Sequence, residues 1–294
     1  MTAFIFTIVR VWVFVMLGFN LLLQSFCDGK ADLSNKQVES NIVNTNSDNA
    51  KALTNPMRLF VPSYFNSGDF TGDGKGEWNR LVNSLQAGDV MMINPNSGPG
   101  NNPEVGFKNA IAAARAKNII VLGYVYTLKK GNDVPRSVEE IKSDIAKYDS
   151  FYEINDIFFD EFVDTPDVPE STLPFYTEIC KYVHANGGRT ALNPGAVAKE
   201  PFANITDWIV VFESPYDEYK NYEMTHWDWS LKPKYHDKIV HLILGAKKGF
   251  MPSVVKKARD ANAAYLYVTD FNVGEGEWDK VATYWDAELV EIRK

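Results

Sequence analysis

The chain has 294 residues, of which 45% are hydrophobic and 23% are charged. This composition is typical of a globular protein, and the length allows one large domain or two small ones. The formal net charge is −8 and the isoelectric point is near 5.1. Because the chain is acidic and has no Lys/Arg cluster, nucleic acids and anionic membrane surfaces are poor candidates for partners.

Residues 1–27 predict a secretory signal peptide. The first ten residues end in Arg10, the segment Val11–Leu23 is almost wholly apolar, and Ser25 and Cys27 have the spacing that a signal peptidase prefers. The alternative is an uncleaved signal anchor, because this segment is nearly long enough to span a bilayer. We expect cleavage, secretion to an extracellular, spore-coat or cell-wall location, and no membrane association afterwards.

Residues 28–56 predict a disordered linker or propeptide. The segment is polar, rich in Asn and Ser, and lacks a hydrophobic period, so it cannot bury enough apolar surface to fold. The folded domain is therefore predicted over residues 57–294. Within it, Asn204 begins the sequence Asn204-Ile205-Thr206, which is an N-glycosylation signal compatible with export.

From Met57 onward, short apolar runs alternate with helical patterns. The runs predict eight strands: Arg58–Pro62, Asp89–Asn94, Ile119–Tyr124, Asp156–Asp160, Arg189–Asn193, Trp208–Glu213, Ile239–Leu244 and Tyr265–Thr269. The patterns between them predict eight helices: Glu77–Gln86, Pro103–Lys117, Val138–Phe151, Leu173–Asn186, Val197–Phe202, Asp217–Trp229, Pro252–Asn262 and Trp278–Glu291.

Eight strand–helix units over about 235 residues predict a single (β/α)8 TIM barrel of the α/β class. An open doubly wound sheet is the rival architecture. Its first strand–helix turn normally carries a glycine fingerprint for a dinucleotide, and this sequence has no convincing one.

Polar or aromatic residues follow each predicted strand. A barrel gathers the eight C-terminal strand ends around one mouth, so these residues are candidates for contacting a substrate. For a histidine inside a strand pattern, a satisfied core imidazole is the alternative. The candidate substrate-binding residues are Tyr64, Asn94, Asn96, Tyr124, Tyr126, Asn193, His241 and Asp270.

Two apolar runs end in carboxylates. One is Asp156–Glu161, which ends in Asp160 and Glu161, and the other ends in Glu213. The fourth and sixth strands of an eight-stranded barrel are two apart, so their ends can face one cleft. Clustered like charges raise carboxyl pKa values, which suits the general acid of a glycoside hydrolase. The same cluster can alternatively hold a divalent cation such as Mg²⁺.

Two further features stay open at this stage. Oxygen side chains in the segment Ser67–Glu77 approach the first half of a calcium loop, but Arg80 stands where the final bidentate Glu belongs, so a loop that caps the first helix is the alternative. The calcium candidates are Asp69, Thr71, Asp73 and Glu77. Aromatic residues after Glu213 fit either a sugar-stacking wall or helix packing: Tyr216, Tyr219, Tyr222, Trp227 and Trp229.

Several segments together resemble one known family. They are Ile93–Gly100, Leu122–Thr127, Asp156–Glu161, Ala191–Gly195, Phe212-Glu213 and Tyr267–Asp270. In this order they look like the spherulation-specific family 4 (spherulin-4-like) proteins, classed with glycoside hydrolase family 135, over about Met57 to Trp285.

The resemblance implies a (β/α)8 barrel that acts as an endo-glycosidase on α-1,4-linked N-acetylgalactosamine stretches of galactosaminogalactan, in an extracellular or spore-wall setting. It maps the acid triad of the family onto Asp160, Glu161 and Glu213, with no departure at these positions.

The expected function is that of a secreted, monomeric endo-acting glycoside hydrolase with a polysaccharide substrate and no cofactor. Asp160 is expected to act as nucleophile or charge stabiliser and Glu213 as general acid/base, while Glu161 tunes or positions its neighbours. One alternative is a non-catalytic spore-coat or cell-wall protein that binds carbohydrate in the same cleft. Another is a metal-dependent hydrolase, which a chelator would inactivate.

Overall fold

The computed structural model describes residues 56–129, 134–161, 168–195 and 198–294. The predicted signal peptide, residues 28–55 of the predicted linker, and the start of the helix predicted from Val197 lie outside the described residues, as does the side chain of Trp227. Within the described part of the chain, no helix combines the length and the apolar character needed to cross a membrane.

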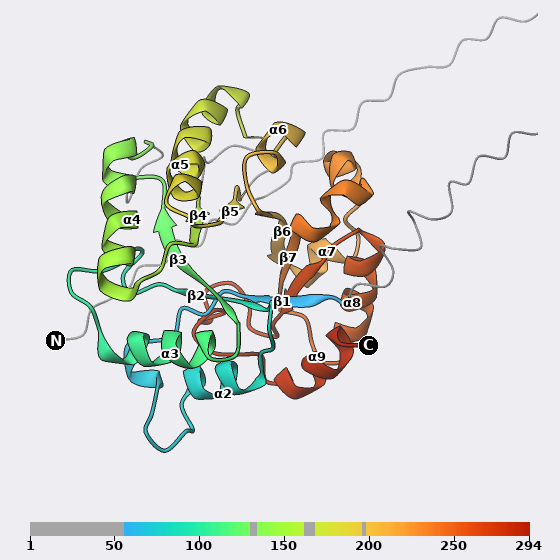
Figure 1. Ribbon diagram of the computed structural model, residues 1–294. Coiled ribbons are helices and arrows are strands. Elements are labelled where there is room, and N and C mark those ends of the chain that lie inside the picture. The colour runs from blue at the N-terminus through green and yellow to red at the C-terminus, as the bar shows by residue number, and fades with distance from the viewer. Residues whose placement is uncertain (1–55, 130–133, 162–167, 196–197) are drawn as a thin grey trace, which may run out of the picture.

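Eight parallel strands form a closed barrel in chain order, which confirms the predicted (β/α)8 architecture (Figure 1). Most strands are short apolar runs that are buried along their whole length, because the barrel interior covers one face and helices cover the other. The strands are β1 (Arg58–Val61), β2 (Val90–Ile93), β3 (Ile120–Tyr126), β4 (Ile157–Asp160), β5 (Thr190–Asn193), β6 (Trp208–Pro215), β7 (Ile239–Leu244) and β8 (Tyr265–Val268).

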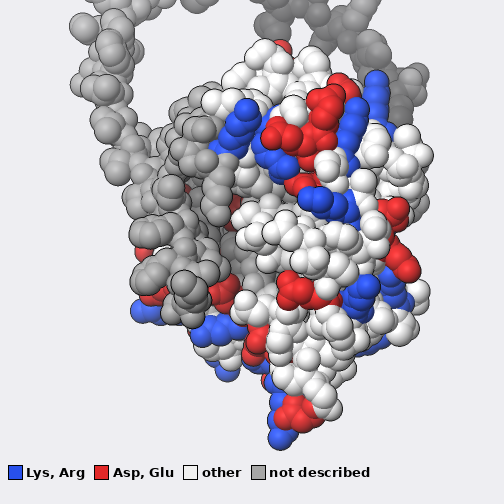
Figure 2. All heavy atoms as spheres, turned by 90° about the vertical axis from the view of Figure 1, so that its left-hand side faces the viewer, with Lys and Arg blue, Asp and Glu red and all other residues white. Residues whose placement is uncertain are grey.

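Helices follow the strands and form the outer layer (Figure 1). The α-helices are α2 (Glu77–Ser84), α3 (Val105–Arg115), α4 (Val138–Tyr152), α5 (Leu173–Ala185), α6 (Glu200–Ala203), α7 (Tyr216–Tyr219), α8 (Met251–Asp260) and α9 (Trp285–Ile292). Short 3₁₀ helices are η1 (Ser67–Asp69), η2 (Glu170–Thr172), η3 (Met224–Leu231) and η4 (Pro233–Lys238). On the face shown in Figure 2, acidic and basic side chains are interspersed.

Aromatic side chains fill the interior of the barrel below its mouth. The ring of Phe60 lies 6.0 Å from Phe158, 6.5 Å from Trp208 and 6.1 Å from Tyr265, measured between centroids. These rings come from β1, β4, β6 and β8, so they close the barrel across its width. Because side chains two apart on a strand point the same way, Asp160 lies directly above the ring of Phe158. The aromatic layer is thus the floor beneath the predicted carboxylates.

The helix predicted over Asp217–Trp229 is wrong in its extent. The helix α7 ends at Tyr219, and the 3₁₀ helix η3 follows after a short break. The ammonium group of Lys257 donates to the carbonyl oxygens of Tyr219 and Tyr222 at 2.5 and 2.8 Å. The carbonyl oxygen of Tyr219 also accepts from the N–H of Tyr222, three residues on, so the chain tightens after α7 and Lys257 satisfies the carbonyl oxygens left at the end of the helix.

The last predicted helix also begins later than expected, at Trp285 rather than Trp278. The preceding backbone N–H groups are bound elsewhere: that of Val281 donates to Glu77 and that of Thr283 to Asp270. This segment therefore ties the loop after β8 to the first helix instead of forming a helical turn.

We predict that Gly123→Ala destabilises the barrel because β3 packs directly against α4 at this glycine. A Cβ atom at position 123 would lie 2.8–2.9 Å from three ring atoms of Tyr148, whose hydroxyl group holds the carbonyl oxygens of Ile93 and Tyr124. The expected cost is about 1–3 kcal/mol of unfolding free energy, seen as a lower Tm. Gly72→Ala is the control, since a Cβ there meets nothing within 4 Å. Equal Tm values for the two variants would contradict this packing.

Candidate active site

Three polar side chains meet at the C-terminal ends of neighbouring strands. Asp160 ends β4, Asn193 ends β5 directly beside it in the strand register, and Glu213 lies near the end of β6. A β-bulge between Val210 and Phe212 shifts β6 just before Glu213. Since β5 lies between β4 and β6, the two acids flank Asn193 on one rim of the barrel.

The amide of Asn193 joins the two acids. Its Nδ2 atom donates to Oδ1 of Asp160 at 2.8 Å and to Oε2 of Glu213 at 2.5 Å. The two acceptor oxygens therefore cannot be further apart than the sum of these distances, 5.3 Å. Both carboxyl groups are within reach of a single sugar linkage.

Asp160 is held on both of its oxygens. The hydroxyl group of Tyr124 donates to Oδ2 at 2.7 Å, while Asn193 occupies Oδ1. The side chain of Asp160 is only 9% exposed, and the ring of Tyr64 packs edge-on against Tyr124 at 5.4 Å. Hydrogen bonds to both oxygens fix the orientation of this carboxyl group and favour its ionised form.

The environment raises the carboxyl pKa values of both acids. The pKa of Glu213 is raised to about 7: burial is the largest cause, the hydrogen bond from Asn193 opposes it, and the charges of Glu161 and Glu277 contribute to the rise. Burial also raises the pKa of Asp160, as do the charges of Glu213 and Glu161, while the Tyr124 hydroxyl opposes the shift. Two buried acids this close share protons rather than ionise independently, so the pair retains a proton near neutral pH.

Glu161 is the outer member of the acid trio. Its φ of 52° lies in the left-handed region, so the chain turns out of β4 at this residue, whose side chain is exposed. Oε2 of Glu161 accepts a hydrogen bond from Tyr126 at 3.3 Å. Thr127 Oγ1 contacts the carbonyl oxygens of both Asp160 and Glu161, and Tyr176 lies 3.2 Å from the same hydroxyl group. The turn that presents the two acids is thus fixed from β3 and α5.

The structure brings together half of the predicted substrate-binding residues. Tyr64, Tyr124 and Asn193 surround the Asp160–Glu213 pair, and Tyr126 contacts Glu161. Tyr176 was not predicted as a site residue, because an aromatic residue in a helical pattern is usually part of the hydrophobic core.

The other loop residues are engaged elsewhere. Asn94 Oδ1 accepts from the backbone N–H of Gly98 at 3.3 Å and steadies its own loop, in which Asn96 is exposed. Asp270 accepts hydrogen bonds from the backbone N–H and the hydroxyl group of Thr283 at 3.0 and 2.5 Å.

His241 is not brought to the carboxylates. Its ring is fully buried, 2.8 Å from the hydroxyl group of Tyr219 and packed against Phe212. Burial lowers the pKa of this imidazole to about 3, so it is neutral. The ring is thus a core imidazole, but only Nδ1 is satisfied, since Nε2 is buried without a hydrogen-bond partner among the described residues.

The aromatic residues after Glu213 mainly pack the chain onto the barrel. Tyr219 and Tyr222 pack on Phe212, with ring centroids 4.7 and 5.1 Å away. The indole N–H of Trp229 donates to the carbonyl oxygen of Ala198. Tyr216 differs, since it stacks at 4.8 Å on Phe250, which is 47% exposed.

The calcium candidates do not converge on one point. Asp69 accepts from the backbone of Asn66, Asp73 from the hydroxyl group of Thr71, and Glu77 from the backbone of Val281. Across the described ranges, no group of three or more His, Cys, Asp or Glu side chains is placed to hold a metal ion. The observed role of this loop is to connect β1 to α2.

Asn204 lies just after α6 and is exposed. Its Oδ1 atom accepts a hydrogen bond from the hydroxyl group of Tyr235 at 2.9 Å. Glycosylation at this asparagine stays a prediction.

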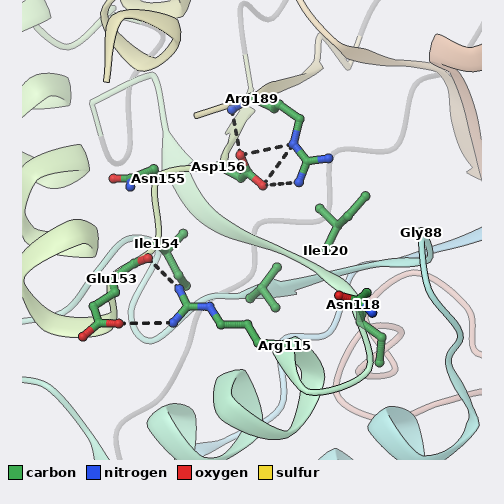
Figure 3. A pocket seen from close by; sticks show the side chains of 11 residues that line it. Gly88, Arg115, Asn118, Ile120, Glu153, Ile154, Asn155, Asp156 and Arg189 are labelled. Carbon is green, nitrogen blue, oxygen red and sulfur yellow. Dashed lines mark hydrogen bonds and ion pairs between the residues drawn. The ribbon is translucent and has the colours of Figure 1, made fainter. Parts of the chain in front are cut away.

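A pocket of about 570 Å³ lies at the opposite rim, around the starts of β3, β4 and β5 (Figure 3). Its charged side chains pair with one another: the guanidinium group of Arg189 binds both oxygens of Asp156, and that of Arg115 binds the backbone and carboxylate of Glu153. In barrels of this kind the N-terminal rim serves stability, whereas chemistry takes place at the C-terminal rim. This pocket is therefore separate from the acid trio.

We predict that Glu213→Gln stabilises the protein at pH 8 but not at pH 4. Between the ordinary Glu pKa of 4.5 and the folded-state value of about 7, the folded chain binds more protons than the unfolded chain, so stability falls as pH rises. A neutral Gln removes this penalty, worth roughly 1–3 kcal/mol above pH 7. Thermal unfolding at both pH values measures the effect, with Glu218→Gln on the exposed surface of α7 as control. An equal Tm difference at both pH values would contradict the raised pKa.

Comparison with known proteins identifies the family of this chain. The sequence model of "Spherulation-specific family 4" matches residues 58–292. A comparison with curated proteins finds no match.

The matches among solved structures include two proteins from microbial sources. The crystal structure of Aspergillus clavatus Sph3 in complex with GalNAc superposes with a TM-score of 0.66 at 20% identity, covering 82% of this chain and 99% of Sph3. The spore cortex-lytic enzyme SleL of Bacillus cereus gives a TM-score of 0.47 at 10% identity, covering 81% of this chain and 75% of SleL. The likeness to Sph3 agrees with the barrel fold, and the family match spans almost the whole barrel. The chain therefore belongs to the spherulation-specific family 4.

Proposed function

We propose that this protein is a secreted, endo-acting glycoside hydrolase that cleaves polysaccharides containing α-1,4-linked N-acetylgalactosamine. The observation that carries the proposal is the pairing of Asp160 and Glu213 through one amide, at a separation that suits hydrolysis of a glycosidic bond. Membership of the family and a fold shared with Sph3, whose structure contains GalNAc, support the class of sugar.

Glu213 acts as the general acid/base. Its carboxyl pKa of about 7 keeps a substantial protonated fraction at neutral pH, and it is less deeply buried than Asp160. In the first step it donates its proton to the oxygen of the leaving sugar as the glycosidic bond breaks. In the second step it takes a proton from the attacking water and returns to its starting state.

Asp160 acts as the nucleophile. Hydrogen bonds from Tyr124 and Asn193 hold its carboxylate in one orientation. Its oxygen forms a bond to the anomeric carbon as the leaving group departs, and water later breaks this bond to release the sugar. Glu161 tunes the pair, because its negative charge raises the pKa of both acids.

Sugar contacts are proposed for residues around the mouth. Tyr126 and Glu161 lie on the outer rim beside the acids, and Tyr64 lies against Tyr124. Asn94, Asn96 and Asp270 are kept as contacts for more distant sugar units, whereas buried His241 is left out. Export through the signal peptide 1–27, the linker 28–56, a monomeric state and glycosylation at Asn204 complete the proposal.

Asp160→Asn and Glu213→Gln are each expected to lower kcat by at least about 100-fold while leaving the fold intact, since each removes a group that handles charge or protons in the transition state. The measurement is fragment release, by mass spectrometry, from a panel of amino-sugar polymers that includes α-1,4-linked N-acetylgalactosamine.

Matched controls are Asp217→Asn and Glu218→Gln, which make the same chemical changes on the exposed surface of α7. Near-wild-type hydrolysis by either active-site variant would remove that residue from catalysis. If the wild-type chain binds these polymers without releasing fragments after long incubation, the rival function holds: a carbohydrate-binding coat or wall protein.

We expect the reaction to retain the anomeric configuration. The two carboxyl oxygens that share the Asn193 amide are at most 5.3 Å apart, which is nearer to the roughly 5–5.5 Å of retaining enzymes than to the roughly 6.5–9.5 Å at which inverting enzymes place a water. Early ¹H NMR spectra of the product, taken before mutarotation, should show the α-anomer at the new reducing end. A β-anomer as the first product would contradict the proposed role of Asp160.

A further inference from the structure

Asn193 has no N–H group left for a sugar. A side-chain amide carries two hydrogens, and both are directed to carboxyl oxygens, one on Asp160 and one on Glu213. The residue is 6% exposed, so its side chain is almost wholly enclosed by the barrel. In this respect Asn193 differs from the more exposed residues at the mouth of the barrel, such as Tyr126 and Asn96.

The other end of the amide is left unpaired in this orientation. Within the described residues, Asn193 Oδ1 is buried and has no hydrogen-bond partner. Leaving a buried acceptor unpaired is unfavourable, and rotating the amide by 180° would instead turn this oxygen toward two carboxyl groups. At least one of the two carboxyl groups is ionised, and in the rotated amide its oxygen would lose an N–H donor and face Oδ1 instead, so the ionised carboxyl group dictates how the amide lies.

The position on β5 explains why one side chain can serve both acids. In the strand register Asn193 pairs with Asp160, while the bulge in β6 after Val210 places Glu213 within reach on the other side. Without a donor between them, two carboxyl groups within 5.3 Å would be driven apart by their like charges.

We propose that Asn193 is a positioning residue: its amide sets the separation of Asp160 and Glu213 and holds both as hydrogen-bond acceptors, and it does not contact the sugar. The inference rests on the proposed function and deepens it, because it assigns to Asn193 a task in the acid pair rather than in substrate binding.

The pKa of Glu213 depends on the titratable groups that surround it. In the described part of the chain these titratable groups are Asp160 and Glu161 on and after β4, Tyr64 after β1, and Glu277 in the loop before α9. The negative charges of Asp160, Glu161 and Glu277 oppose ionisation of Glu213, whereas the Asn193 amide favours it. Loss of the amide should therefore raise the pKa of Glu213 and never lower it.

The test is a ¹³C NMR titration of the carboxyl groups in the full chain, with the Glu213 signal assigned through Glu213→Gln. In Asn193→Leu, which keeps a similar volume without donors, the Glu213 midpoint should rise by roughly one pH unit or more, because a hydrogen bond to a charged group is lost. On an α-1,4-linked N-acetylgalactosamine oligosaccharide, kcat should fall about 10- to 100-fold with KM within about twofold. The basic limb of the kcat profile should move up with the midpoint.

Thr190→Val is the matched control on the same strand. Thr190 is buried at the other end of β5 and bonds to Thr206 and Asp207, far from the acids in the register. This variant should lower Tm without moving the Glu213 midpoint. If Asn193→Leu does not fold, Asn193→Ser, with one hydroxyl donor, must move the midpoint in the same direction.

An unchanged midpoint in both Asn193 variants would overturn the inference, and so would a raised KM with an unchanged pH profile. An equal shift of the Glu213 midpoint in Thr190→Val would show that any loosening of β5 has this effect, and would also overturn the inference. The proposed function fails separately, namely if Glu213→Gln still hydrolyses the oligosaccharide. The titration is read without substrate and does not depend on that result.

Discussion

The close approach of two buried carboxyl groups is the constraint on which the site depends. Asp160 and Glu213 repel each other when both are ionised, and burial makes each charge more costly. Such a pair persists only where the scaffold leaves it no room to separate and supplies donors that offset the charge. The amide of Asn193 and the hydroxyl group of Tyr124 are those donors.

The rest of the barrel keeps these donors in place. Rings from four strands fill the barrel interior beneath the acids. At the opposite rim, Arg189 pairs with Asp156, and its guanidinium group lies 5.1 Å from the centroid of the Trp208 ring. The Arg189–Asp156 ion pair thus packs against the aromatic layer from the N-terminal rim, and the acids lie on the opposite side of that layer.

Much of the fold follows from local sequence signals. A parallel strand buried on both faces is a short apolar run, and each of the eight runs became a strand within two residues of its predicted limits. The segment after Glu213 was less predictable, because its aromatic residues have a helical spacing but the carbonyl oxygens at the end of α7 are bound by Lys257 from α8. No local pattern reveals a cap that comes from more than thirty residues away.

The sequence by itself determined the barrel and the rim at which Asp160, Glu161 and Glu213 lie, because an acid that follows a buried apolar run must emerge at the end of its strand. Only the tertiary structure decided which polar neighbours face the acids. In a strand covered on both sides, inward and outward positions are equally apolar, so no alternation marks the direction of a side chain. His241 therefore turned to the helices and Asn193 to the carboxyl groups, as set by strand register and the bulge in β6.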